Sequence, residues 1–317
     1  MSVRTQIGAV VIGRNEGARL VRCLASLQDQ TGRIVYVDSG SDDDSVAAAR
    51  DAGAQVVLLD TDQPFTAARA RNAGLDQLAA GPTPPAFVQF IDGDCELQPG
   101  WTDTALAFLL AEPKVAVACG RRRERFPDAS VYNRLIDAEW DTPIGEARAC
   151  GGDSVMRIQA VRDAGGFNAA LIAGEEPELC LRLRDAGWKV WRLETEMTLH
   201  DADITRFSQW WQRNRRTGHA YAEGAGLHGG HNIARRRRAL IWGMGVPLAA
   251  TLGLAVTPWA LAILLLWPVQ VLRLIRRGMG RERALFTTLG KIPEAVGVVG
   301  YHLRRLRGGQ NTLIEYK

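Results

Sequence analysis

The sequence has few cysteines, and no two of them lie close together. The five cysteines of this 317-residue chain are Cys23, Cys95, Cys119, Cys150 and Cys180, and they form no CxxC pair. This spacing indicates neither a zinc cluster nor a disulfide framework, and it is typical of a reducing compartment.

The N-terminal region lacks the features of a signal peptide. Its apolar run, Ile7–Ile12, is short and leads directly into Arg14-Asn15-Glu16, without a stretch of small residues that would form a cleavage site. We therefore expect the part of the chain that carries the chemistry to stay in the cytoplasm.

Acidic residues outnumber basic ones in the first two thirds of the chain and are scarce afterwards. Residues 1–200 contain 21 Lys/Arg and 29 Asp/Glu, a net charge of −8, whereas residues 201–317 contain 18 and 6, a net charge of +12. Hydrophobic residues make up 46% of the sequence, which excludes wholesale disorder. The asymmetry indicates an acidic part and a basic part with different roles.

Charge is missing altogether from one long stretch, Ala239 to Leu272. A single helix of that length would measure roughly 50 Å, which exceeds the hydrocarbon core of a membrane at about 30 Å. We expect two short helices hinged at Thr257-Pro258, which either span the membrane or only dip into it. Arginines close both ends, which places both at the cytoplasmic face of the inner (plasma) membrane. A core hairpin of a soluble protein is the alternative.

The first 120 residues alternate apolar runs with helical patterns. The expected strands are Ala9–Ile12, Ile34–Val37, Val56–Leu59 and Phe87–Ile91, and the expected helices include Gly17–Gln28, Asp44–Asp51 and Thr66–Ala80. Strands that alternate with helices predict an α/β fold with a mostly parallel sheet covered on both faces. Ligands bind beyond the carboxyl ends of the strands in such sheets.

Polar clusters follow three of these strands directly. They are Arg14-Asn15-Glu16, the run that begins with Asp38, and Asp92-Gly93-Asp94. The two aspartates of the third cluster can hold a divalent cation such as Mg²⁺ or Mn²⁺, which bridges the oxygens of a diphosphate. Asp38 can hydrogen-bond a nucleobase, while Asp42–Asp44 can cap the next helix.

Five motifs, in order and spacing over residues 7–190, resemble those of family 2 glycosyltransferases. Val10–Glu16 resembles the VVIPxxNE opening, Val37–Asp43 the VDDGSxDxT segment, Ala70–Leu75 the ARNxGL segment, Ile91–Asp94 the LDxD motif, and Gly174–Leu183 the GEDxDLxLRL segment. The resemblance implies a GT-A fold, which is a Rossmann-like, mostly parallel sheet flanked by helices. It also implies inverting transfer of a sugar from a nucleoside-diphosphate sugar donor.

The resemblance also implies roles for particular residues. Asn15, Glu16 and Asp38 would hold the nucleoside, Arg71 would lie near the base or pyrophosphate, and Asp92 and Asp94 would serve the nucleotide and the metal. His200, downstream of these motifs, would complete the metal shell.

The general base of the family is the second acid of the ED pair, which is Glu176 in this chain. A carboxylate just ahead of a helix can point into a cleft, where partial burial raises its pKa. The family has Asp at this position, so both Glu175 and Glu176 are candidates for the base. The two acids can alternatively cap the helix expected over Glu178–Gly187.

Trp210–Arg216 resembles the QxxRW motif of processive polysaccharide synthases, although Arg216 stands where the family has Trp. This difference, together with a single short hairpin, argues against processive export of a polymer. We expect Arg215 to close over the diphosphate as part of a lid, and anchoring in the membrane interface beside the two tryptophans is the alternative.

These patterns divide the chain into four parts: a GT-A catalytic domain (1–205), a basic, Trp-rich linker or lid (206–238), a hydrophobic hairpin (239–275) and a basic amphipathic C-terminal segment (276–317). Within the last part, residues 284–306 can lie in the membrane interface or pack on the catalytic domain.

The expected function is transfer of a single sugar to a lipid-linked or membrane-proximal saccharide in exopolysaccharide or glycolipid assembly. Membrane lipids are expected partners. One alternative acceptor is a polyprenyl phosphate, and another alternative is a non-catalytic, nucleotide-binding membrane scaffold. Nucleic acid is not expected as a partner, because the arginines surround an apolar hairpin and do not line an exposed helix or aromatic-bearing sheet.

Overall fold

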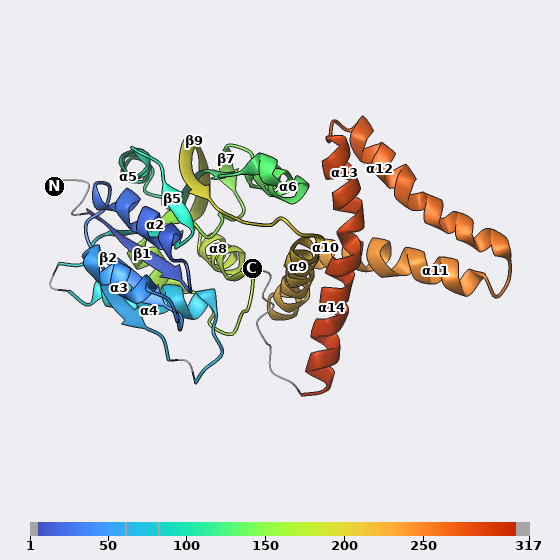
Figure 1. Cartoon of the computed structure of the whole chain (residues 1–317), viewed down its shortest axis with the longest axis horizontal. Helices are drawn as coiled ribbons and strands as arrows, with labels where there is room; N and C mark the ends of the chain where they lie inside the picture. The colour runs from blue at the N-terminus through green and yellow to red at the C-terminus, as the bar shows by residue number, and fades with distance from the viewer. Residues whose placement is uncertain (1–5, 61, 82, 309–317) are drawn as a thin grey trace. The chain divides into compact units, whose positions relative to one another are not determined.

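The computed structural model describes residues 6–60, 62–81 and 83–308, which form two compact units (Figure 1). The first comprises the described parts of Met1–Ala129, Ile136–Leu171 and Glu175–Asp203. The second comprises Ser130–Leu135, Ile172–Gly174 and the described part of Ile204–Lys317. The end of the expected C-terminal segment, 309–317, lies outside the described residues.

The first unit is built on one mixed β-sheet. Its strands are β1 (Ile7–Gly13), β2 (Ile34–Asp38), β3 (Gln55–Leu58), β4 (Phe87–Asp92), β5 (Cys95–Leu97), β6 (Val115–Glu124), β7 (Gly145–Ala147), β8 (Ser154–Arg157) and β9 (Lys189–His200). The order is β3-β2-β1-β4-β8-β6-β9-β5, and β7 pairs with β9. Strands β3, β2, β1 and β4 are parallel, and β6 is parallel to β9, whereas β8 is antiparallel to both of its neighbours.

Strand β1 is buried on both of its faces, which explains why its sequence is apolar without interruption. Ile7, Ala9 and Val11 face one hydrophobic core, while Val10 and Ile12 face a second core on the opposite side of the sheet. Successive side chains of a strand point to opposite faces, so a strand covered on both sides must be apolar throughout. The four expected strands and the α/β fold class are confirmed.

Helices pack on both faces of this sheet. The helices along this part of the chain are α2 (Ala18–Gln28), α3 (Ser45–Asp51), α4 (Ala67–Ala79), α5 (Trp101–Ala111), η1 (Pro127–Ala129), α6 (Val131–Trp140), α7 (Ile158–Asp163) and α8 (Glu175–Asp185). Helix α8 begins three residues before the expected start at Glu178, so Glu175 and Glu176 lie in its first turn.

The second unit is helical within the described residues. Its elements are α9 (Phe207–Leu227), α10 (Ile233–Leu240), the π-helical turn η2 (Ile241–Gly245), α11 (Val246–Gly253), the 3₁₀ helix η3 (Pro258–Leu265), α12 (Leu266–Arg276), α13 (Arg281–Leu289) and α14 (Lys291–Leu306). The segment 206–238, expected as a linker or lid, is thus largely helical.

Helices α9 and α14 pack closely because glycines line their contact. A Cβ atom on Gly218 of α9 would clash with the backbone carbonyl of Glu294, and one on Gly297 of α14 would clash with that of Arg215. Nearby, the guanidinium of Arg304 lies 2.8 Å from Nδ1 of a buried His219. Residues 291–306 therefore pack within the second unit.

This packing predicts opposite effects for two substitutions on α14. Gly297→Ala is expected to destabilise the protein by about 1–3 kcal/mol, because the new methyl group meets backbone. Gly300→Ala is the matched control, because a Cβ at Gly300 meets nothing within 4 Å. It is expected to stabilise the helix by about 0.5–1 kcal/mol. Thermal unfolding in detergent measures both, and equal shifts for the two variants would contradict the close helix contact.

The long apolar stretch forms two helical arms. Residues 254–257 make the turn between α11 and η3, where the Thr257 side chain accepts a hydrogen bond from the Trp259 amide. The arms meet again where Nε1 of Trp267 donates to the carbonyl of Trp242 at 3.1 Å. The segment Pro258–Arg276 is long and apolar enough to cross a membrane, and only 6% of its most apolar window is buried.

Candidate active site

The carboxyl ends of β1, β2 and β4 lie at one edge of the sheet, because these strands are parallel neighbours. Their ends are also joined directly by backbone hydrogen bonds. The amide of Ser39 donates to the carbonyl of Gly13 at 3.2 Å, and the amide of Gly93 donates to that of Ile12 at 2.8 Å. The three polar clusters of the sequence are thereby brought together.

Asp38 and Asn15 hold the loop that follows β2. The Asp38 carboxylate accepts hydrogen bonds from the amides of Gly40 at 3.0 Å and Ser41 at 2.9 Å. Asn15, in a left-handed conformation with φ 55°, accepts from the Asp42 amide at 2.9 Å through its side-chain oxygen. Both residues fix a polar loop at the strand ends, and their contact with a nucleoside stays a prediction.

Glu16 lies beside the turn of the Asp92-Gly93-Asp94 motif. A Cβ on Gly93 would stand 3.2 Å from Cγ of Glu16, so only glycine leaves this approach free of crowding. The Glu16 carboxylate forms an ion pair with Arg19 at 2.9 Å.

Arg71 of α4 bridges two acids that are far apart in sequence. Its guanidinium is only 3% exposed and donates to Asp92 at 2.8 Å and to Glu175 at 2.5 Å. Burial of this cation is tolerated because both carboxylates compensate its charge. The bridge ties the end of β4 to the first turn of α8, and a contact of Arg71 with the nucleotide stays a prediction.

Glu176 follows in the same turn of α8 and is half-buried. Burial and the neighbouring Glu175 carboxylate raise the pKa of Glu176 to about 8, although Arg71 opposes the shift. A carboxylate whose pKa lies near the working pH is suited to accept a proton. Glu175 differs, because its carboxylate is engaged by Arg71.

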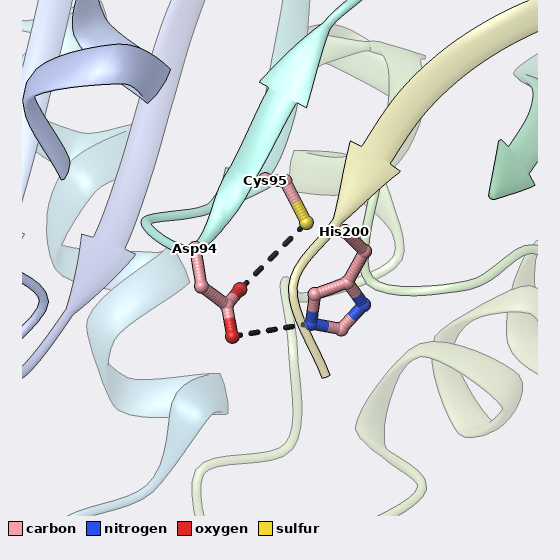
Figure 2. A group of neighbouring side chains, drawn as sticks. All are labelled: Asp94, Cys95 and His200. Atoms are coloured by element: carbon pink, nitrogen blue, oxygen red, sulfur yellow. Dashed lines mark hydrogen bonds and ion pairs between the residues drawn. The ribbon is translucent and has the colours of Figure 1, made fainter. Parts of the chain in front are cut away.

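Asp94, Cys95 and His200 form a compact group where β5 pairs with β9 (Figure 2). Nε2 of His200 lies 3.1 Å from Asp94, and Sγ of Cys95 lies 3.7 Å from the other oxygen of the same carboxylate. One potential ligand atom from each residue lies within 4.8 Å of the others. All three side chains are buried.

The donor set of this group fits a divalent cation held by Asp94 and His200. A carboxylate oxygen and an imidazole nitrogen are ligands for Mn²⁺, and Nδ1 of His200 has no hydrogen-bond partner among the described residues. Cys95 is a poor ligand for a hard cation, because burial raises the pKa of its thiol and keeps it neutral. The carboxylate of Asp92 is bound by Arg71, so a metal role for Asp92 stays a prediction.

Three residues around this group were not anticipated from the sequence as site residues. Asp153, fully buried, accepts hydrogen bonds from the Asp92 amide at 3.3 Å and the Thr198 hydroxyl at 2.8 Å, and it pairs with Arg122 at 3.1 Å. Arg122 in turn lies over the ring of Trp140 at 5.2 Å. The only sequence signal was the glycine pair that precedes Asp153.

Trp140 also covers His200. The two rings stack with centroids 4.7 Å apart and an interplanar angle of 15°. This contact restricts the orientation of the imidazole that we assign to the cation.

Arg215 belongs to the second unit. It lies on α9, and its guanidinium donates to Gln212 at 3.3 Å, one turn earlier on the same helix. Its expected role as a nucleotide lid stays a prediction.

The fold and the arrangement of acids at the strand ends define a GT-A domain. Residues 9–167 match the sequence profile of glycosyl transferase family 2, and the chain belongs to that family. A pre-mycofactocin glycosyltransferase of Mycobacterium tuberculosis is 28% identical over 211 residues, which are 62% of this chain and 42% of that protein. The chain therefore spans less than half the length of this relative.

Solved structures agree with the fold. A mannosyltransferase from Pyrobaculum calidifontis, in complex with GDP-Man and Mn²⁺, has a TM-score of 0.63 at 16% identity and covers 93% of this chain and 87% of its own. Glucosyl-3-phosphoglycerate synthase from Mycobacterium tuberculosis, in complex with phosphoglyceric acid, has a TM-score of 0.51 at 19% identity, with 71% and 80% covered. At these identities the likeness concerns the fold alone.

Proposed function

We propose that the protein is an inverting glycosyltransferase that moves one sugar from a nucleoside-diphosphate sugar to a lipid-linked or membrane-proximal saccharide, in exopolysaccharide or glycolipid assembly. Membership of glycosyl transferase family 2 supports the use of a nucleotide sugar. The observation that carries the mechanism is the position of Glu176, a half-buried carboxylate in the first turn of α8, where its surroundings raise its pKa to about 8.

The transfer follows from the placement of Glu176. Glu176 takes the proton of an acceptor hydroxyl, whose oxygen forms a bond to the anomeric carbon while the bond from that carbon to the diphosphate breaks. Arg71 holds Glu175 and Asp92 and so positions the first turn of α8. Asp94 and His200 would hold the divalent cation, which when bound neutralises charge on the departing diphosphate.

The stereochemistry of the product tests this mechanism. The purified chain is incubated with a panel of nucleotide sugars and a membrane extract as acceptor source, and the anomeric configuration of the new linkage is determined by NMR. Direct attack by the acceptor predicts a configuration opposite to that of the donor. A retained configuration would contradict the single displacement.

The pH dependence of the rate follows from the pKa of Glu176. Only the ionised carboxylate accepts a proton, so the rate is expected to rise about tenfold per pH unit below pH 8 and to level off above it. A steady-state pH profile between pH 6 and 9 measures this. The residual activity of Glu176→Gln should not show this rise of the rate with pH. A rise that persists in this variant would show that another group titrates.

We also propose that the chain attaches to the cytoplasmic face of the inner membrane through its apolar hairpin. Large apolar side chains along both arms are each more than half exposed, including Leu252, Val256, Trp259, Leu261, Leu265 and Val269. An exposed apolar surface of this extent needs a cover, and arginines at both ends of the hairpin favour the cytoplasmic side.

Charges placed in the hairpin are expected to weaken this attachment. In Leu261→Arg/Leu265→Arg, each arginine costs about 2.5–3.5 kcal/mol near the middle of a membrane helix. Flotation with phosphatidylcholine vesicles should show the variant largely in the protein-only fraction. The matched control, Leu58→Arg/Leu110→Arg, alters two leucines of the first unit that are 60% and 56% exposed, and it should float like the unaltered protein. Equal flotation of both variants would contradict attachment through the hairpin.

A further inference from the structure

A basic pocket lies in the second unit where α10, η2, α12, α13 and α14 converge. It has a volume of about 350 Å³. Four of the side chains that line it are cationic, namely Arg238 of α10, Arg273 of α12, Arg277 directly after α12, and Lys291 of α14. These residues lie on or directly after three helices that are separated by up to about 50 positions in the sequence, so only the fold assembles the pocket.

Three of the four cations are uncompensated within the described residues. Lys291 pairs with Glu294 at 2.7 Å, which neutralises it. Arg238, Arg273 and Arg277 are exposed, and their side chains make no hydrogen bond or ion pair with any other described residue. Three free guanidinium groups that face one cavity attract an anion, and the planar donor fork of arginine suits phosphate oxygens.

A neighbouring groove combines arginines with two apolar side chains. A second cavity of about 490 Å³ shares Arg273 and Arg277 with the basic pocket and is otherwise lined by Val269, Leu272 and Arg276. Val269 and Leu272 are 57% and 55% exposed. Trp242, which lines the basic pocket, adds an aromatic ring of the kind that gathers at membrane interfaces. A ligand for both cavities therefore combines a phosphate with a hydrocarbon chain.

We propose that this basic pocket binds the phosphate headgroup of an anionic membrane phospholipid, with an acyl chain along Val269 and Leu272. The proposal rests on the proposed membrane attachment, which brings the lipid to the hairpin. The phosphodiester of such a lipid carries the negative charge that would pair with the three arginines. The acyl chain of the same lipid covers apolar side chains that otherwise face water. Phosphatidylglycerol has this chemistry, whereas the headgroup of phosphatidylcholine carries its own cation and has no net charge.

The experiment uses the full chain in a neutral detergent, titrated calorimetrically with dioctanoyl-phosphatidylglycerol, dioctanoyl-phosphatidylcholine or inorganic phosphate. The expected result is a dissociation constant at least about tenfold lower for phosphatidylglycerol than for phosphatidylcholine. Inorganic phosphate should bind far more weakly, because it lacks the acyl chain. Equal affinities for the two lipids, or competition by phosphate at equal concentration, would overturn the proposal.

A pair of triple variants separates a pocket from diffuse attraction. Arg238→Ala/Arg273→Ala/Arg277→Ala removes the three pocket charges and should abolish the preference for phosphatidylglycerol. The matched control, Arg237→Ala/Arg281→Ala/Arg283→Ala, removes three exposed arginines that do not line the pocket and should keep it. Equal loss in both variants would overturn the proposal, because it would show that net charge alone attracts the lipid.

The membrane attachment is tested separately by flotation of the unaltered chain with pure phosphatidylcholine vesicles. Absence of flotation together with an intact preference for phosphatidylglycerol would refute the attachment and leave the lipid site standing. Flotation without a lipid preference would refute the lipid site and leave the attachment standing.

Discussion

Replacing Glu176 with Gln is expected to lower the rate of sugar transfer to a hydroxyl acceptor by about 10²–10⁴-fold. The amide keeps the size of the side chain but cannot take the proton of the acceptor. Since Glu176 is separate from the group formed by Asp94 and His200, binding of the nucleotide sugar should change little. Single-turnover kinetics, together with a titration of donor binding, measure the two quantities independently.

Two further variants, Glu112→Gln and Glu175→Gln, test whether the loss of rate is specific to Glu176. Glu112→Gln alters an exposed acid at the end of α5 and should leave the rate unchanged. Glu175→Gln removes the charge that pairs with Arg71, and it should keep the rise of the rate with pH, because Glu175 positions the turn and does not take the proton. The rise should shift below pH 8, because the Glu175 carboxylate that helps to raise the pKa of Glu176 is gone. A full rate in Glu176→Gln with a hydroxyl acceptor would refute the proposed base. Activity that survives only with a polyprenyl phosphate would identify a nucleophile that is already ionised.

Replacing Asp94 with Ala is expected to weaken binding of Mn²⁺ by more than about 100-fold and to abolish metal-dependent turnover. Asp94 lies at the centre of the group in Figure 2, with contacts to both His200 and Cys95. Electron paramagnetic resonance of free Mn²⁺, in the presence of a nucleoside diphosphate, measures the affinity without reference to activity.

Substitutions of His200 and Cys95 test whether the cation is held by the imidazole nitrogen or by the sulfur. His200→Ala should also weaken Mn²⁺ binding, whereas Cys95→Ala should leave it nearly unchanged, because the buried thiol is neutral. Unchanged Mn²⁺ affinity in Asp94→Ala would contradict the assignment of the cation site. A large loss in Cys95→Ala alone would place the cation on sulfur, a ligand that suits softer metals.

The parallel part of the fold could be predicted from the sequence because it depends on local patterns. Strands β1, β2 and β4 are mostly apolar, and a polar cluster stands at or directly after the end of each. Their positions and the edge that carries Asp38 and Asp92 therefore follow from the sequence alone. The family motifs added the acids at the start of α8.

The contacts that organise the site could not be predicted, because they join residues that are distant in sequence. Arg71 contacts Asp92 and Glu175, which lie 21 and 104 positions away. Asp153 receives bonds from residues on β4 and β9, and no local pattern marks it as the buried centre of a network. Such pairings follow from the sheet order, in which β8 and β6 lie between β4 and β9.

The second unit also includes short segments from elsewhere in the chain, which composition does not reveal. Residues 130–135 and 172–174 belong to it although they lie within the span of the first. One such contact is the bond from the Arg216 guanidinium to the carbonyl of Ile172 at 2.9 Å. The apolar run and its flanking arginines were visible in the sequence, but the pocket they form with Lys291 required the fold.

The most direct test of the central claim is release of a nucleoside diphosphate by the purified chain from a panel of nucleotide sugars, with membrane extract as acceptor source. The measurement compares the unaltered chain with Glu176→Gln and Asp94→Ala, with and without Mn²⁺. Our account predicts release from at least one donor that requires Mn²⁺ and is lost in both variants. Absence of release from every donor, or equal release by all three proteins, would contradict it and favour a scaffold that binds nucleotides without turnover.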